Sequence, residues 1–233
     1  MTDSQALPPV DVTLDSGPTG AGSIDDFEPF YARRALDRFR TRLGREGLLE
    51  LLAVDIEKGN AFLRRSALAS DGGFRAGTTD LTTRGLSSGE FLAWMEKAFA
   101  GDEDALLAAH PEHYVMAPGA DGAFNVVENI GPHVCSFSMG GWGTDAMAWA
   151  TDAAELLPES EFPHKMSSNL FLADGTVVGR ALTQFGDTSD GFTASLTVYV
   201  PTAGPQDVVL EHHLRHYAVE FRNWITAAAR SRV

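Results

Sequence analysis

Residues 206–229, QDVVLEHHLRHYAVEFRNWITAAA, combine helical length with one-sided hydrophobicity. The segment follows the helix-breaking pair Gly204–Pro205. Its apolar residues recur at intervals of three and four, which places them on one face of a helix. They are Leu214, Tyr217, Phe221, Trp224, Ile225 and Ala228. The pattern predicts one long amphipathic helix whose apolar stripe needs a surface to cover it.

Short β-like runs separated by turn signals fill the region before this helix. The runs are 112–117, 124–130, 133–139, 146–150, 167–173, 176–184 and 192–200. Asp174–Gly175 is the strongest two-residue hairpin signal. An antiparallel sheet buries its apolar face most simply against a long helix, so we expect an α+β fold with a helix-grip sheet wrapped around residues 206–229. A cone-shaped sheet with helices on one face is the alternative.

Helical patterns dominate the N-terminal half. A helix is expected to begin at Ser23 and to be interrupted at Gly44, and Ser87 and Glu90 have the spacing of a capping box. Residues 71–77 are expected to form a glycine-rich loop. The expected organisation is a disordered tail over 1–23, a helical region over 24–110 and a helix-grip domain over 111–233.

Composition restricts the classes of function. The 233 residues carry a formal net charge of −14, so phosphate backbones are repelled and nucleic acid is a poor partner. The lone Cys135 excludes an intrachain disulfide framework. No apolar run approaches the ~20 residues that cross a bilayer, and the N-terminus lacks the pattern of a signal peptide. We expect a soluble, cytoplasmic protein that takes a small-molecule partner and no membrane, with a homodimer left open.

The spacing of His216 and Glu220 points to a metal site. Residues four apart lie on one face of a helix, so an imidazole nitrogen and a carboxylate can converge on one cation. Glu220 falls at the edge of the apolar stripe, with His216 further out. The alternative is an exposed ion pair that stabilises the helix by a few tenths of a kcal/mol.

A second cluster lies in HPEHYVMAPGADGAFNVVENIG, residues 110–131. His113 begins one predicted strand, and Glu128 lies on the next, where an unpaired carboxylate within an apolar run is costly. Either a cation or Arg180 must compensate that charge. His110 ends a predicted helix, where a histidine complements the helix dipole.

The segment from His113 to Glu128, together with HYAVEFRNW near the C-terminus, resembles the 2,4-diacetylphloroglucinol and phloretin hydrolases. That family has a helix-grip (Bet v 1/START-like) domain and binds zinc through two histidines and two glutamates. The resemblance implies a zinc site and hydrolysis of the carbon–carbon bond between a phenolic ring and an acyl group. The implied zinc ligands are His113, Glu128, His216 and Glu220.

Such a reaction also needs a proton donor and a cavity wall that contacts the aromatic ring of the substrate. His164 and Tyr114 are the candidate proton donors, although a loop position and strand packing explain them equally well. Trp142, Trp149 and Tyr199 are candidates for the cavity wall, with core packing as the alternative. Two other classes remain beside the metal-dependent hydrolase: a non-catalytic helix-grip protein that binds a small hydrophobic ligand, and an interaction protein with surface histidines.

Overall fold

The computed structural model describes residues 17, 22–119, 123–140, 147 and 149–232. The chain divides into two compact units between Gly44 and Arg45. The expected tail over residues 1–23 lies almost entirely outside the described part. Each unit is described by itself below.

The described part of the first unit is the beginning of helix α1 (Ile24–Ala69). The Ser23 hydroxyl accepts from the Asp26 amide at 3.3 Å, and Asp26 Oδ2 accepts from the Ser23 amide at 2.8 Å, which caps the helix as expected. Gly44 has φ 63°, a left-handed conformation that interrupts the helix. The expected start and break of the helix are therefore confirmed.

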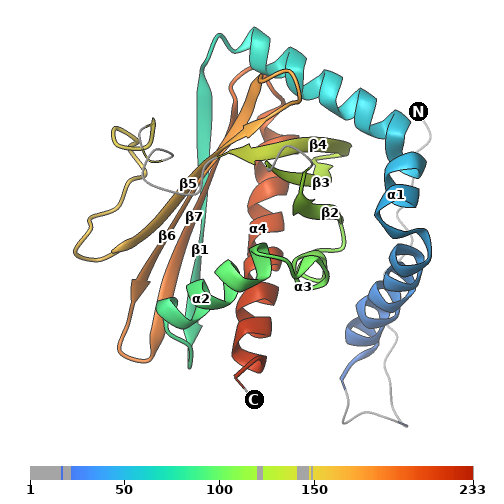
Figure 1. Ribbon diagram of the computed structural model, residues 1–233. Helices are drawn as coiled ribbons and strands as arrows, with labels where there is room; N and C mark the ends of the chain where they lie inside the picture. Colours follow the sequence, from blue (N-terminus) through green and yellow to red (C-terminus); the bar gives the residue numbers. More distant parts are fainter. Residues whose placement is uncertain (1–16, 18–21, 120–122, 141–146, 148, 233) are drawn as a thin grey trace, which may run out of the picture. The chain divides into compact units, whose positions relative to one another are not determined.

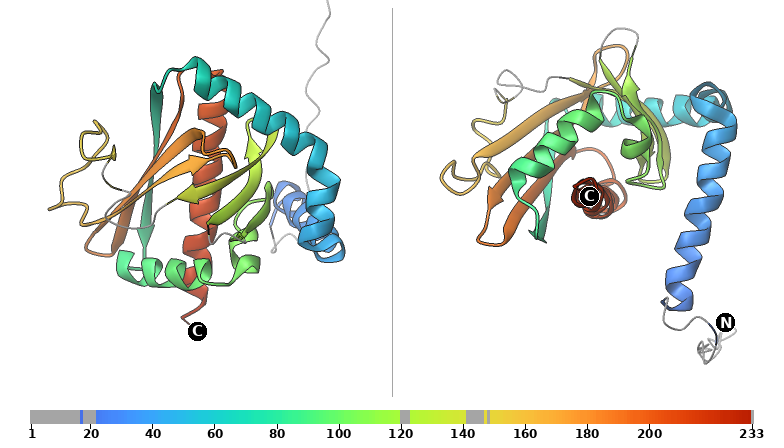
Figure 2. Two further views of the ribbon diagram at one scale, coloured as in Figure 1. Left: turned by 45° about the horizontal axis from the view of Figure 1, so that its top comes forward. Right: turned by 60° about the horizontal axis from the view of Figure 1, so that its bottom comes forward.

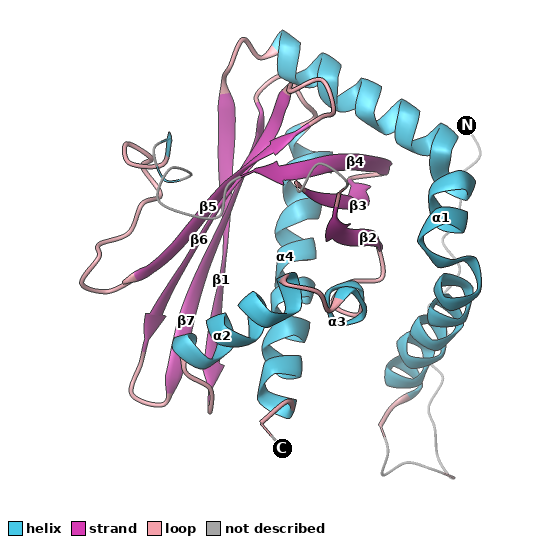
Figure 3. Ribbon diagram, in the orientation of Figure 1, coloured by secondary structure: helices cyan, strands magenta, loops and turns pink. Residues whose placement is uncertain are grey.

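Within the described residues of the second unit, seven strands form one antiparallel sheet in the order β1-β7-β6-β5-β4-β3-β2 (Figure 1 and Figure 3). The strands are β1 (Phe74–Arg84), β2 (His113–Pro118), β3 (Phe124–Ile130), β4 (His133–Gly140), β5 (His164–Phe171), β6 (Val177–Asp187) and β7 (Gly191–Pro201). The helices that follow α1 are α2 (Ser88–Phe99), α3 (Glu103–Leu107) and α4 (Gln206–Arg230). The sheet curves around α4, seen end-on in Figure 2, so the helix-grip fold is confirmed.

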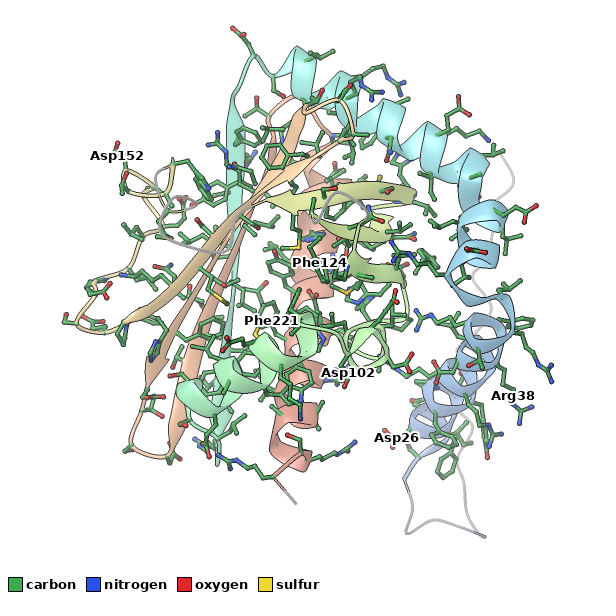
Figure 4. All side chains as sticks on the ribbon, viewed as in Figure 1. Asp26, Arg38, Asp102, Phe124, Asp152 and Phe221 are labelled. Atoms are coloured by element: carbon green, nitrogen blue, oxygen red, sulfur yellow. The ribbon has the colours of Figure 1, made fainter. Side chains whose placement is uncertain are left out.

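The core lies between the concave face of the sheet and the apolar face of α4. Phe221 and Trp224 are buried there, and Phe221 packs with Phe91 of α2 and Phe185 of β6 at ring-centroid distances of 6.3 and 6.4 Å. Figure 4 labels Phe221 and Phe124, which both belong to this core. Fully burying a side chain of this size contributes ~1.5–3 kcal/mol, so the stripe of α4 holds the unit together.

Strand β1 corrects the expectation that the first 110 residues are helical and that 71–77 is a loop. It pairs with β7 along its whole length, from Phe74↔Pro201 to Arg84↔Gly191. Two of its threonines bond to elements distant in sequence: Thr79 Oγ1 donates to the Leu214 carbonyl of α4 at 2.9 Å, and the Thr78 and Thr197 hydroxyls lie 2.9 Å apart. Gly77 lies against α4, where a Cβ would come within 2.9 Å of a Leu210 methyl. The glycine that suggested a loop instead permits close packing of strand and helix.

The predicted strand over 146–150 lies partly outside the described residues. Of its described members, Met147 and Trp149 have 3-10 conformation and Ala150 lies in a turn. The Ala150 amide donates to the Met147 carbonyl at 2.9 Å, a local bond that takes the place of a ladder bond. The expectation of a strand is therefore wrong for these three residues.

Candidate metal centre

Four side chains from β2, β3 and α4 converge at one point beside the core. His113 Nε2 lies 2.8 Å from His216 Nε2, 3.5 Å from Glu128 Oε2 and 3.6 Å from Glu220 Oε1. His216 Nε2 lies 3.6 Å from Glu128 Oε2. These are the four ligands that the family resemblance implies, and the structure brings them together.

A β-bulge aims His113 at this point. His113 pairs with Glu128, whereas Val115 pairs with Val127 and Met116 with Val126, so Tyr114 is an extra residue in β2. Without it, His113 and Met116 would lie on opposite faces of the sheet, because three residues separate them and side chains alternate. The bulge turns both toward the concave face, where Glu128 lies.

The orientation of His113 is held from α3. Its Nδ1 lies 3.2 Å from the Leu106 carbonyl, so Nδ1 carries the proton and donates it. Nε2 is then an unprotonated nitrogen that faces His216 Nε2 at 2.8 Å. Two imidazole nitrogens at this distance need either a proton or a cation between them.

The four residues are withdrawn from solvent, with exposed fractions of 0% for His113, 5% for Glu128, 2% for His216 and 5% for Glu220. Burial, and then the nearby Glu112 carboxylate, raises the pKa of Glu128 to about 8. Burial, and then Glu128, raises the pKa of Glu220 well above its usual value. Burial lowers the pKa of His216. Burial therefore favours the neutral forms of Glu128, Glu220 and His216, and a bound cation would supply the positive charge that the ionised carboxylates need.

The donor set fits a zinc-like dication. Zinc is bound by histidine nitrogens and carboxylate oxygens at ~2.0–2.2 Å. One ion with such bonds can reach the donor atoms of His113, His216 and Glu128, which lie 2.8–3.6 Å from one another. Glu220 Oε1 lies 3.6 Å from His113 Nε2. His113 also has the carbonyl partner on its second nitrogen that metal-binding histidines usually have. Glu220 joins the cluster through His113.

A buried cavity of about 60 Å³ adjoins the two carboxylates. Glu128 and Glu220 form part of its wall, and α2 and α4 close it against the sheet. Most of the remaining wall is apolar. It includes Met95, Phe99, Met116, Val126, Phe137, Met139, Met166, Leu170, Ala181, Phe221 and Trp224.

Two cavity residues of α4 were not singled out as functional by sequence. His213 lines the cavity with its Nε2 4.0 Å from Glu128 Oε1, and its Nδ1 is buried with no hydrogen-bond partner among the described residues. Burial, then His212 and His110, lowers the pKa of His213 to about 3. Tyr217 lies beside it at a ring-centroid distance of 4.9 Å. His213 lies three residues before His216, and Tyr217 lies three residues before Glu220. This helical spacing was the signal in the sequence that could have identified both residues.

His110 and His216 lie deeper than the sequence suggested. Their rings stack with centroids 3.7 Å apart, and both side chains are buried. The more exposed position expected for His216 is wrong, whereas the interpretation of His110 as a helix-dipole complement stays a prediction. The apolar stripe of α4 predicts which face of the helix packs on the sheet. It does not predict that β2, β3 and α3 also cover the adjoining face of the helix.

The two candidate proton donors lie away from the cavity wall. His164 is exposed at the start of β5. It borders an open hollow that shares Met95, Phe99 and Met166 with the cavity. Tyr114 donates its hydroxyl to Asn129 Oδ1 at 3.0 Å. Glu128 faces the cavity, so its neighbour Asn129 faces the opposite side of β3, and Tyr114 follows it there.

The aromatic candidates belong to the convex face. Trp142 lies outside the described residues. Trp149 and Tyr199 pack edge to face at 5.1 Å, in a small cluster on the side of the sheet opposite the cavity. Tyr199 alternates with Val198 and Val200, which belong to the main core.

Arg180 does not pair with Glu128. Ala181 and Thr183 of β6 line the cavity, so Arg180 points to the convex face. Its guanidinium lies over the rings of Phe74 and Trp149, at 4.5 and 5.1 Å from their centroids. The hypothesis of an Arg180–Glu128 ion pair is therefore wrong, because strand alternation separates the two side chains.

Neither a family model nor a curated protein matches the sequence. Solved structures with a similar trace include Ara h 8.0201, with 10% identity, a TM-score of 0.41 and coverage of 67% of this chain and 98% of that chain. A norcoclaurine synthase point mutant from Thalictrum flavum, in complex with a transition state analogue, has 12% identity, a TM-score of 0.42 and coverage of 69% and 98%. An uncharacterized protein from Rhizobium leguminosarum has 11% identity, a TM-score of 0.35 and coverage of 68% and 97%. The helix-grip assignment rests on the chain's own topology.

Among the described residues, none of the helices has both the length and the hydrophobicity that a membrane span requires.

Proposed function

We propose that this protein is a metal-dependent hydrolase that cleaves the carbon–carbon bond between a phenolic ring and an acyl group of a small aromatic ketone. The observation that carries the proposal is the convergence of two buried histidines and two buried carboxylates beside an apolar cavity. The resemblance of residues 113–128 and 216–224 to the acylphloroglucinol-type hydrolases supports the reaction class. A homodimer and a cytoplasmic location stay predictions.

His113, Glu128, His216 and Glu220 would hold the ion. When bound, a zinc-like dication supplies Lewis-acid polarisation of a carbonyl oxygen. The two carboxylates match its two positive charges, and the Leu106 carbonyl keeps His113 Nε2 directed at it. Because Glu128 and Glu220 also line the cavity, a carbonyl group in the cavity would lie beside the centre.

The remaining cavity residues suit an aromatic substrate. Phe99, Phe137 and Trp224 offer apolar surface to a ring. Ring-carbon protonation needs a group that carries a proton within the cavity, and His213 and Tyr217 both line it. Burial keeps the His213 ring neutral, whereas burial raises the pKa of Tyr217 and its hydroxyl keeps its proton. We therefore assign this role to Tyr217 in place of His164 and Tyr114.

The cavity must widen to take such a substrate. Its volume of about 60 Å³ is below the ~300–1,000 Å³ of typical small-molecule sites. Met95, Met116, Met139 and Met166 make up much of the wall, and methionine side chains repack readily. Substrate binding is thus expected to displace methionine side chains while the ligand cluster keeps its place.

The test combines metal content with turnover. Protein prepared without chelator is analysed for bound metal by mass spectrometry and incubated with an acylated polyhydroxybenzene, with release of the carboxylic acid as the readout. Glu128→Gln is expected to lower both metal content and turnover, whereas Glu211→Gln, an exposed change on α4, is expected to leave both unchanged. Binding of the ketone by metal-free protein without acid release would instead support a non-catalytic ligand-binding protein.

A further inference from the structure

A second histidine–glutamate pair lies beside the candidate metal centre, at the protein surface. His212 Nε2 and Glu112 Oε2 are 3.1 Å apart, and their side chains are 30% and 35% exposed. These two residues and His216 each offer a ligand atom within 4.8 Å of the others. His216 therefore belongs both to this outer group and to the buried centre.

The outer pair is held in position by the backbone. The Gly131 amide, in the turn between β3 and β4, donates to His212 Nδ1 at 3.3 Å. This bond leaves the proton of the neutral ring on Nε2, which faces the Glu112 carboxylate. Glu112 directly precedes His113 in the chain, so one short segment contributes to both groups.

The buried centre needs a route for its ion. All four of its ligands are at most 5% exposed, so solvent cations do not meet them directly. His216 offers a second, independent sign of a ligand. Its Nε2 faces His113, and its Nδ1 is buried without a hydrogen-bond partner among the described residues.

We propose that Glu112 and His212 form an outer divalent-cation site from which the buried centre is loaded through His216. The inference rests on the proposed metal-dependent function and adds how the ion reaches its ligands. Glu112 attracts the cation from solvent. His212 binds it through Nε2 in its other tautomer: Nε2 gives its proton to solvent, Nδ1 takes one up, and the hydrogen bond from the Gly131 amide is released. Once the ion has moved to the buried ligands, the His212–Glu112 hydrogen bond forms again.

The test measures the rate at which the protein takes up zinc separately from its final zinc content. Metal-free full-length protein is mixed with Zn²⁺, and the ion that remains free is followed over time with a chromophoric zinc indicator. The variants are Glu112→Gln and His212→Asn, whose amide can still accept from the Gly131 amide. Glu211→Gln, at an exposed position next to His212 on α4, is the matched control. Circular dichroism melting confirms that each variant is folded.

The expected result is loading at least about tenfold slower in both variants, since local charge changes capture rates by 10-fold or more. Their final zinc content should equal that of the wild type, and the control should load normally. Unchanged loading rates would overturn the outer site, and so would a lower final content, which would make the pair a permanent part of the centre. A wild type that takes up no zinc would overturn the proposed function as well.

Discussion

The convex and concave faces of the sheet differ in the partners that they give to their polar side chains. On the convex face, Arg180 lies over two aromatic rings, and the Tyr199 hydroxyl donates to Glu155 Oε2 at 2.9 Å. On the concave face, the ion pairs that Glu128 and Glu220 make within the described part of the chain are with histidines alone. The Tyr199 hydroxyl has a carboxylate partner and Arg180 lies over aromatic rings, although Arg180 Nε and Trp149 Nε1 are buried without a hydrogen-bond partner among the described residues. In that part of the chain, the concave carboxyls pair only with histidines, and their ionised forms would lack a matching positive charge.

This difference separates a structural cluster from a functional one. A polar network whose members satisfy one another rigidifies a fold. A buried carboxylate with its pKa raised to about 8 destabilises the folded protein unless something further binds. The difference between the faces therefore predicts that added metal changes what the concave residues contribute to stability and leaves the contribution of the convex residues unaffected.

The largest effect is expected from Trp224→Ala. Trp224 is buried in the core stripe of α4, and its ring centroid is 6.3 Å from that of His113. The cavity left behind should lower the free energy of unfolding by ~3–5 kcal/mol, as measured by urea denaturation. Metal-binding stoichiometry in the folded fraction should persist. A loss below ~1 kcal/mol would show that the concave core does not hold the unit together.

The stability of chelated protein should fall as pH rises from 6.5 to 8. The pKa of Glu128 is about 8 in the folded protein against a usual 4.5, so the folded state binds more protons in this window. Ionisation then costs on the order of 2 kcal/mol across the window. His213 and His216 do not oppose this trend, since burial lowers the pKa of each below this pH range.

The metal-loaded protein should show the reverse, because the metal binds the ionised carboxylate. Melting temperatures taken with and without chelator across this pH range check both trends. Identical melting-temperature curves with and without chelator would show that a bound ion does not cause the difference between the two faces.

Glu220→Gln should affect metal binding and stability in opposite directions. It keeps the size of the side chain but removes a charge that the dication needs, so zinc content should fall. The metal-free variant should be more stable than metal-free wild type, because burial raises the pKa of the Glu220 carboxyl well above its usual value and glutamine avoids the cost of that shift. Calorimetric titration with zinc and denaturation of the chelated proteins measure the two effects. Equal zinc affinity in both proteins would exclude Glu220 from the centre.

The smallest effect belongs to the convex face. Tyr199→Phe removes the hydrogen bond to Glu155 while the ring keeps its packing on Trp149. The free energy of unfolding should drop by ~1 kcal/mol, and zinc content should stay the same. A change in zinc content would show that the two faces are coupled.

Local pattern was sufficient for much of the fold. The stripe of α4, the capping box at Ser87 and the hairpin around Asp174–Gly175 each depend on neighbours within a few residues, and all three are present. Residues 74–84 could not be recognised as a strand, because their polar threonines become favourable only once β7 and α4 lie against them.

The sequence by itself determined that His216 and Glu220 lie on one face of α4, because helical spacing is a property of the backbone. The tertiary structure decided what that pair meets. The bulge at Tyr114 turns His113 toward Glu128, and packing of β2, β3 and α3 against α4 buries both pairs. It also placed Arg180, Trp149 and Tyr199 on the far face. Strand register and bulges depend on contacts between segments distant in sequence, so one residue of slip reverses which face a side chain occupies.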